Sequence, residues 1–558
     1  MDNSEKVADP TGTDGTGSVA AEAAEAASSS LPLEMLDAVA GLVDPDTIAR
    51  NLPWLAGELT EIARGRSDIW FPERDRRFAD KAWQTSPYFH TIGQAYRLYE
   101  LWMDRMCQGV DGSWQRQARA RLAANLATAL LAPPNYLPTN PVALRRAAET
   151  SGQSLVRGAE NLARDLARGG MPRAADRERF VVGDKLAVTP GAVVYREEMF
   201  ELLEYAPTTS SVRDRPLLMV PPQVNRYYVL DLAPGRSLAE FAVSQGIQTF
   251  MMVWRNPSAL LGHGRWGVDD YIAAQLRAAD VVRKIARSDT LNWLGLCAGG
   301  MTVASMLGYL AATGGDPAAS ATFIVTMMSG AQPNVVGALD TRNTRARLVA
   351  MARAGQVVPG TAQRALFALL RPTELVFNYL VNGWLMGEAP PPFDVLAWND
   401  DATATTAKFA LEMTKIVMDG WGDATGPTLL GVTSDLGKVS CDSFHIAGYT
   451  DHITPWRACY STTALLGGSK ELTVVRSGHI QSFVNPADST RYDCWYGPTS
   501  ATDPDEWLAT ATVQHGSWWH RWGDWLTARA GDERAARSTL GNRQFAPLGP
   551  APGGYAVG

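Results

Sequence analysis

The stretch Gly295-Leu-Cys-Ala-Gly-Gly300 decides how this chain folds and which chemistry it can perform. It has the G-x-S-x-G shape of a nucleophile elbow, with Cys297 in the place of the serine. Thr290 to Leu296 predict a short apolar strand before it, and Met301 to Ala312 predict a helix after it. Glycines suit so tight a corner, and the partial positive charge of a helix N-terminus favours a thiolate. Because a buried cysteine is usually a small hydrophobe, these six residues alone leave both interpretations open.

Two later segments favour a catalytic cysteine. Ser443 to Thr450 predict a strand with Asp451 at its carboxyl end, and Glu471 to Arg476 predict a second strand with His479 just beyond it. Loops at the carboxyl ends of parallel strands are where α/β folds keep their chemistry. The order nucleophile, acid, histidine is that of α/β-hydrolases. We therefore predict a catalytic triad of Cys297, Asp451 and His479.

Periodicity and proline punctuation divide the chain into regions. Residues 1–30 are acidic and rich in Ala, Ser and Gly, which predicts a disordered tail and no signal peptide. Residues 31–178 predict an all-helical N-terminal domain, and residues 179–558 an α/β-hydrolase catalytic domain. Within the latter, about 331–435 loses strand alternation and predicts an inserted helical cap. The predicted fold is therefore an α/β-hydrolase with a cap, preceded by a helical domain.

The start of the catalytic domain carries further strand signals. Leu186 to Thr189 and Ala192 to Tyr195 flank Pro190-Gly191, which predicts a hairpin. Strands at Leu217–Val220 and Thr249–Trp254 then alternate with helical stretches. This alternation indicates a mostly parallel sheet.

Composition limits the classes of partner. The net charge of −7 argues against nucleic acid. Five cysteines without a pattern indicate a reducing compartment, and hence the cytoplasm. No apolar run is long enough to span a bilayer. The 18 tryptophans suggest a large apolar surface to cover or present.

The other histidines and cysteines have structural interpretations, and we predict neither a metal nor a cofactor. His452 adjoins Asp451 but should point away from it, which favours a structural role. The remaining histidines show no metal-ligand spacing, and the remaining cysteines form no C-x-x-C pair. These residues are His90, His263, His445, His515 and His520, and Cys107, Cys441, Cys459 and Cys494.

Around the triad the chain resembles the polyhydroxyalkanoate synthases of the single-subunit type. The resemblance runs in order from about residue 70 to the C-terminus. The segments that carry it are Asp75–Phe78, Pro134–Pro141, Val220–Asn225 with Tyr227-Tyr228, Trp254–Pro257, Asp269–Tyr271, the Gly295–Gly300 box, Phe393–Asn399, Asp451–Trp456, Ser477–Ser482 and His515–Trp519.

The resemblance implies polymerisation of (R)-3-hydroxyacyl-CoA into polyester, with release of CoA and a covalent thioester on Cys297. A thioester exchanges with CoA at near-equal energy, which suits transfer better than a serine ester would. His479 is the expected general base. Asp451 could orient His479 or help to activate the incoming 3-hydroxyl, and the sequence leaves both roles open. The expected oxyanion donors are the backbone N–H groups of Ala298 and Val224.

The same resemblance implies the surroundings in which the enzyme works: the surface of a growing granule in the cytoplasm, as a homodimer. CoA is polyanionic, so its groove should be locally basic, and the candidates are Arg213, Arg215, Arg226 and Arg255. Monomer length stays open, although Gln223 favours the medium-chain type. Two alternatives stay open as well: a Cys-dependent thioesterase or esterase on this fold, and a catalytically idle granule-coating protein.

Overall fold

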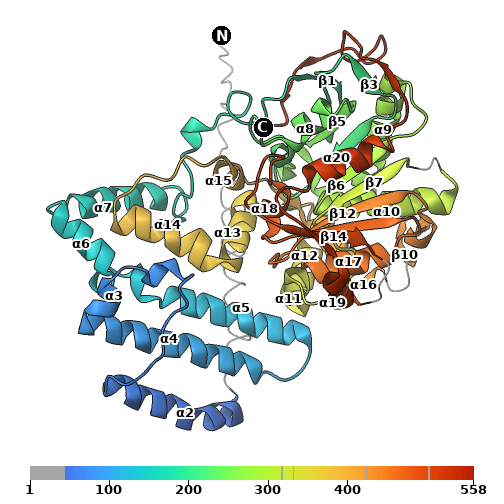
Figure 1. Cartoon of the computed structure of the whole chain (residues 1–558). Coiled ribbons are helices and arrows are strands. Elements are labelled where there is room, and N and C mark those ends of the chain that lie inside the picture. The colour runs from blue at the N-terminus through green and yellow to red at the C-terminus, as the bar shows by residue number, and fades with distance from the viewer. Residues whose placement is uncertain (1–43, 316–317, 331, 422–424, 500–502, 558) are drawn as a thin grey trace, which may run out of the picture.

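A computed structural model describes residues 44–315, 318–330, 332–421, 425–499 and 503–557, so the predicted tail at 1–30 lies outside the described residues. A layer of helices packs beside a larger α/β part (Figure 1). The N-terminal helices are α2 (Pro45–Ala63), α3 (Ala82–Thr85), α4 (Pro87–Gln108), α5 (Trp114–Leu130), α6 (Pro141–Glu149) and α7 (Gln153–Leu166).

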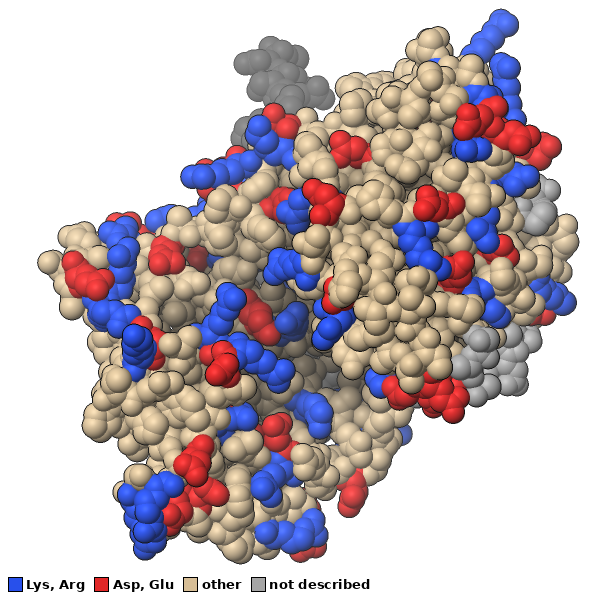
Figure 2. Space-filling model, viewed as in Figure 1, with Lys and Arg blue, Asp and Glu red and all other residues tan. Residues whose placement is uncertain are grey.

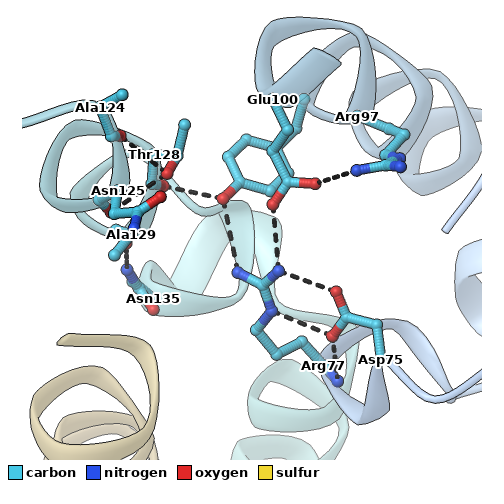
Figure 3. A network of polar contacts seen from close by, with 10 residues as sticks. Asp75, Arg77, Arg97, Glu100, Ala124, Asn125, Thr128, Ala129 and Asn135 are labelled. Atoms are coloured by element: carbon cyan, nitrogen blue, oxygen red, sulfur yellow. Dashed lines mark hydrogen bonds and ion pairs between the residues drawn. The ribbon is translucent and has the colours of Figure 1, made fainter. Parts of the chain in front are cut away.

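A buried polar network ties these N-terminal helices together (Figure 3). Arg77 donates to Asp75 at 2.8 Å and to Glu100, on α4, at 3.0 Å. It also reaches the hydroxyl of Tyr96, which donates to Thr128 O on α5 at 2.8 Å. Burial opposes the charge of Arg77, but the two carboxylates outweigh burial and raise its pKa. The Asp75–Phe78 segment is therefore bound to α4, and Tyr96 of α4 links it onward to α5.

The α/β part is built on an eleven-stranded sheet in the order β15-β14-β13-β12-β7-β6-β4-β5-β2-β1-β17. The six strands from β13 to β5 are parallel, and the outer pairs on both sides are antiparallel. The strands are β1 (Gly191–Arg196), β2 (Phe200–Tyr205), β4 (Leu217–Val220), β5 (Thr249–Trp254), β6 (Asn292–Leu296), β7 (Ser320–Ile324), β12 (Asp442–Gly448), β13 (Lys470–Val475), β14 (Cys494–Pro498), β15 (Thr512–Gln514) and β17 (Gly549–Pro550).

The predicted hairpin around Pro190-Gly191 is wrong. Leu186 to Thr189 form no strand, and β1 pairs instead with β2 on one side. On its other side β1 pairs with β17, more than 350 residues later. A proline–glycine pair indicates a turn, but here that turn leads into β1 rather than joining two strands.

The long segment between β7 and β12, where the sequence predicts a helical cap, holds two short antiparallel strand pairs: β8 (Val357–Val358) with β9 (Thr405–Thr406), and β10 (Thr425–Leu429) with β11 (Val432–Asp435). Helices make up most of the rest. They are α11 (Val335–Leu339), α12 (Arg342–Arg353), α13 (Gly360–Leu370), α14 (Asn378–Leu380), α15 (Asp394–Asn399) and α16 (Ala407–Asp419), with π-helical turns η8 (Thr373–Phe377) and η9 (Val381–Leu385) around α14. In Figure 1 the α13–α14 part of this segment lies between α7 and the sheet. The indole of Trp384 in η9 donates to Asp165 of α7 at 2.9 Å. The N-terminal helices therefore contact this segment directly.

Several tryptophans gather on the helix α20 (Trp519–Thr527), and its aromatic face is buried. Trp518 and Trp519 donate their indole N–H groups to carbonyl oxygens at the end of α18 (His479–Phe483), at 2.8 and 3.2 Å. Trp522 donates to Thr322 on β7 at 3.0 Å. These bonds satisfy the polar atom of each buried indole. They also hold α18 against the sheet.

Basic and acidic side chains are mixed over the face of the molecule shown in Figure 2. That face is hollowed between the helical layer and the α/β part, and Lys and Arg side chains gather around the hollow. None of the helices in the described ranges is both long enough and apolar enough to cross a bilayer.

Candidate active site

Cys297 stands at the corner between β6 and α10 (Ala298–Thr313), as the sequence predicts. Its backbone has φ +50° and ψ −118°, a region that non-glycine residues rarely adopt. The Cys297 N–H donates to Ile324 O at 2.8 Å, and Met301 N–H donates to Cys297 O at 3.0 Å. The strand on one side and the helix on the other hold the half-buried thiol at the carboxyl edge of the sheet.

Close packing explains the glycines of the box. A Cβ on Gly295 would lie 2.5 Å from the Cα of Gly300. A Cβ on Gly299 would lie 2.5 Å from Pro221 O, in the loop after β4, and would also clash with Val220 O. The glycines thus let the elbow close on itself and let the loop after β4 approach the first turn of α10.

The structure brings Asp451 and His479 together beside the cysteine. Asp451 follows β12, and His479 opens α18 just after the neighbouring parallel strand β13. His479 Nδ1 donates to Asp451 Oδ2 at 2.6 Å. The Cys297 thiol is a hydrogen-bonding partner of the same imidazole. His479 and Asp451 are only 8% and 6% exposed, so this pair is shielded from water.

The pair shifts both protonation equilibria. Burial lowers the pKa of His479, but the charge and hydrogen bond of Asp451, aided by Cys297, outweigh burial and raise it to about 10. Burial likewise raises the pKa of Asp451, but the interaction with His479 and hydrogen bonds from Thr454 lower it overall. The favoured state at neutral pH is therefore a carboxylate facing an imidazolium.

Thr454 is a member of this site that the sequence analysis missed. Its N–H donates to Asp451 Oδ1 at 3.0 Å and its hydroxyl to Asp451 Oδ2 at 2.8 Å. The same hydroxyl lies 3.3 Å from His479 Nδ1. Ile453 N–H adds a bond to Asp451 Oδ1 at 2.8 Å. An aspartate followed three residues later by a threonine is a common signal for such a turn, and it would have pointed to Thr454.

The two predicted oxyanion residues lie on neighbouring elements. Ala298 is the first residue of α10, and Val224 lies in the loop after β4 that packs against Gly299. The Val224 side chain is half-buried against the core. The loop is anchored at Arg226, whose carbonyl accepts the indole N–H of Trp398 from α15 at 2.9 Å. The role of the two N–H groups stays a prediction.

Residues of the inserted segment reach the site. Arg371, at the end of α13, places Nη1 3.8 Å from where a Cβ on Gly478 would stand, beside His479. Arg371 and Glu374 also act on His452, whose pKa is lowered mainly by burial. His452 therefore faces this segment, while the imidazole of His479 contacts Asp451.

The arginines predicted to form a CoA groove separate into two pairs. Arg213 and Arg215 precede the amino end of β4, at the sheet edge opposite Cys297, and donate to carbonyl oxygens of residues 531 and 529. The structure thus places neither of them at the site. Arg226 and Arg255 follow the carboxyl ends of β4 and β5 and line one small pocket. Arg226 forms an ion pair there with Asp401 at 3.3 Å.

Outside the triad, His445 and the other four cysteines occupy buried or half-buried positions. His445 is buried on β12 beside Ser443, at 2.9 Å, and burial lowers its pKa to about 3. Cys107, Cys459 and Cys494 are buried and free, and Cys441 is half-buried and free. Within the described part of the chain, His, Cys, Asp and Glu side chains do not gather in the groups of three that a metal ion would need.

Comparison with known proteins gives the family. Residues 74–242 match the family model described as "Poly-beta-hydroxybutyrate polymerase (PhaC) N-terminus". Residues 254–486 match the α/β hydrolase fold, which confirms the predicted fold class.

Curated relatives extend the match over nearly the whole chain. Poly(3-hydroxyalkanoate) polymerase 2 of Ectopseudomonas oleovorans is 37% identical over 91% of both chains. The corresponding polymerase subunit of Cupriavidus necator is 36% identical over 98% of this chain and 92% of its own length. The polymerase of Methylorubrum extorquens is 35% identical over 91% of this chain and 84% of its own. This chain therefore is an enzyme that belongs to the poly(3-hydroxyalkanoate) polymerase family.

Proposed function

We propose that this enzyme polymerises (R)-3-hydroxyacyl-CoA into polyester and releases CoA, with the growing chain held as a thioester on Cys297. The observation that carries the proposal is a cysteine, in place of serine, at an elbow where its thiol meets the buried His479–Asp451 pair. The names of the relatives support the substrate class.

The first step is acylation of the thiol. In the resting site His479 already holds the proton of Cys297 as an imidazolium, and the thiolate attacks the thioester carbon of the substrate. The tetrahedral oxyanion is stabilised by backbone N–H groups, for which Ala298 and Val224 are our candidates. The intermediate collapses, the carbon–sulfur bond to CoA breaks, and the leaving CoA thiolate takes the proton from His479. One thioester is exchanged for another, so little free energy is lost.

Elongation uses the same base. The 3-hydroxyl of an incoming substrate attacks the Cys297 thioester while His479 takes the hydroxyl proton. An ester bond forms, the bond to the Cys297 sulfur breaks, and the returning thiolate recovers the proton from His479. The product, longer by one unit and still linked to CoA, then acylates Cys297 again.

The surroundings of Asp451 support an orienting role for this residue. Its two oxygens accept four hydrogen bonds, from two backbone N–H groups, one hydroxyl and His479. A carboxylate offers about four acceptor sites, so none is left for an incoming hydroxyl. We infer that Asp451 orients and charge-stabilises His479, and that His479 alone activates the 3-hydroxyl.

We also propose that the enzyme works in the cytoplasm at the granule surface, as a homodimer. An insoluble polyester attached at Cys297 would keep the enzyme at the polymer surface. Recovery of the Cys297→Ala variant in the granule fraction of cells that also make polymer with the wild type would show whether covalent attachment is needed for this location.

One assay separates the candidate functions. Purified enzyme is given 3-hydroxybutyryl-CoA or 3-hydroxydecanoyl-CoA, and CoA, polymer and free acid are measured together. The polymerase predicts CoA matched by polymer, and the preferred substrate reports monomer length. A thioesterase predicts CoA matched by free acid, and an idle coat protein predicts no CoA.

The nucleophile is tested with a matched pair of variants. Cys297→Ala should abolish both CoA release and polymer, whereas Cys107→Ala removes a thiol in the separate core of the N-terminal helices and should leave both in place. Polymer made by Cys297→Ala at the wild-type rate would overturn the proposed triad.

A further inference from the structure

We propose that the hydroxyl of Thr302 is a positioning group for the two oxyanion donors. It ties the loop that carries Val224 to the helix whose first residue is Ala298, and so sets the spacing of their N–H groups. This inference rests on the proposed function, because it assumes that an oxyanion forms between these two elements.

Three hydrogen bonds meet at this hydroxyl. Gln223, in the loop after β4, donates its amide N–H to Thr302 Oγ1 at 3.0 Å. Gln275, on α9 (Val268–Ala286), donates to the same oxygen at 2.6 Å. The hydroxyl itself donates to Gly299 O, in the first turn of α10, at 3.0 Å. Thr302 and Gln275 are fully buried and Gln223 is 4% exposed, so water does not compete for these bonds.

The hydrogen-bonding capacity of the Thr302 hydroxyl is fully used. A hydroxyl has one proton and two lone pairs. The proton goes to Gly299 O, and the lone pairs receive the amides of Gln223 and Gln275. The Thr302 hydroxyl therefore connects three elements: the loop after β4, the helix α9 and the start of α10.

Gln223 is well placed to control the loop, because it is the residue before Val224. The loop is held at its start, where the indole of Trp254 donates to Pro221 O at 2.9 Å. It is held again at Arg226 by the indole of Trp398. Between these two points, the Gln223 amide binds the loop to α10 at Thr302. The same loop also packs against α10 at Gly299.

The spacing of the donors matters because an oxyanion hole works only at short range. Both N–H groups must lie about 2.7–3.1 Å from the oxyanion, and loss of one donor typically lowers kcat about 10²–10³-fold. Releasing the loop at Gln223 would displace its donor rather than delete it. We therefore expect a smaller loss, about tenfold, expressed in kcat and not in KM.

The test compares two threonine-to-valine changes. Thr302→Val keeps the shape of the side chain but removes the acceptor of both amides. Thr322→Val is the matched control: Thr322 is also fully buried, and its hydroxyl oxygen also accepts an N–H, from Trp522, but on β7 away from the loop. Both variants should lower the unfolding temperature. Only Thr302→Val should lower kcat about tenfold, with KM for the acyl-CoA within about twofold of the wild type.

Two further variants complete the test. Thr302→Ser keeps the hydroxyl and should restore kcat to within about twofold of the wild type, whereas Gln223→Leu should reproduce the loss in kcat. A wild-type kcat in Thr302→Val, or an equal loss in Thr322→Val, would overturn this inference while leaving the proposed function intact. A wild-type enzyme that releases no CoA from either substrate would overturn the proposed function and this inference with it.

Discussion

The hydrogen bonds around Asp451 hold its carboxylate in place beside His479. Asp451 follows β12, and the turn that it begins returns two backbone N–H groups and a hydroxyl to its carboxylate. Those bonds compensate for burial and keep the group charged next to His479. The charge in turn keeps a proton on the imidazole that lies beside Cys297.

Thr454→Val is expected to move the acid limb of the pH–rate profile to higher pH. The Thr454 hydroxyl lowers the pKa of Asp451, so its removal should raise that pKa. The measurement is kcat/KM from pH 4 to 9 for the wild type and the variant. Thr454→Ser is the control, because it keeps the hydroxyl and should keep the wild-type limb. An unmoved limb in Thr454→Val would contradict this role.

The charge pair should make stability depend on pH in a defined window. The pKa of His479 is raised from 6.5 to about 10, so its stabilisation is complete below pH 6.5 and is lost as the pH rises towards 10. The pKa of Asp451 is lowered from 3.8, so its stabilisation is present above pH 3.8 and lost on acidification. The unfolding free energy of the wild type should therefore exceed that of Asp451→Asn most between pH 3.8 and pH 6.5, where both contributions are present. Urea unfolding at several pH values checks this, and a difference that grows towards pH 10 would refute it.

Among the helices and strands, the sequence predicted those that a local pattern of apolar residues determines. The sequence predicted strands that became β6, β12 and β13 to within a few residues, because each is a short apolar run that ends in polar or glycine residues. The pairing of β1 with β2 and β17 was not predictable, since it depends on contacts between distant segments. Chain order was enough to predict that Cys297, Asp451 and His479 lie together, but Thr454 and the bonds at Thr302 depend on which side chains meet in three dimensions.

Gly299→Ala tests the close approach of the loop to α10. A Cβ there would press on Pro221 O and Val220 O, so the loop must shift. We expect the unfolding free energy to fall by about 1–3 kcal/mol and polymer synthesis to fall at least tenfold. The control is Gly57→Ala on α2, where a Cβ meets nothing within 4 Å. That change should raise stability by about 0.5–1 kcal/mol and leave activity unchanged.

At the scale of the whole molecule, the N-terminal helices contact the inserted segment in more than one place: α7 packs against η9, and Arg119 of α5 donates to Ala338 O of α11 at 3.4 Å. The buried residues of α7 are Ser154, Gly158 and Asp165. Gly158 packs against the backbone of Trp384 in η9, and Asp165 accepts the indole N–H of the same residue. Asn161 donates to Gly383 O at 2.9 Å across the same contact. The inserted segment also places Arg371 beside His479. The N-terminal helices therefore support the segment that lies over the site. The sequence could predict a helical region and an insertion, but not that they touch, and their domain boundaries stay predictions.

Gly158→Ala should loosen this contact, because a Cβ would clash with Trp384 O. Amide exchange across residues 381–388 should become faster. If the segment excludes water from the acyl-enzyme, the ratio of free acid to polymer should also rise. Gly383→Ala, which adds a Cβ to the opposite side of the contact with nothing within 4 Å, is the control. Unchanged exchange in Gly158→Ala would contradict the contact.

The surroundings of the five cysteines should allow a chemical label to measure the fraction of molecules whose Cys297 thiol is free. Burial raises the pKa of Cys107 and Cys459, and raises that of Cys441 and Cys494 to about 12, so these four stay protonated near neutral pH. Cys297 is half-exposed and sits beside an imidazole. A brief exposure to a thiolate-selective alkylating reagent should therefore modify one sulfur per chain. The amount of label bound would give the fraction of molecules with a free nucleophile in any preparation, including one in which polymer already occupies part of the sample.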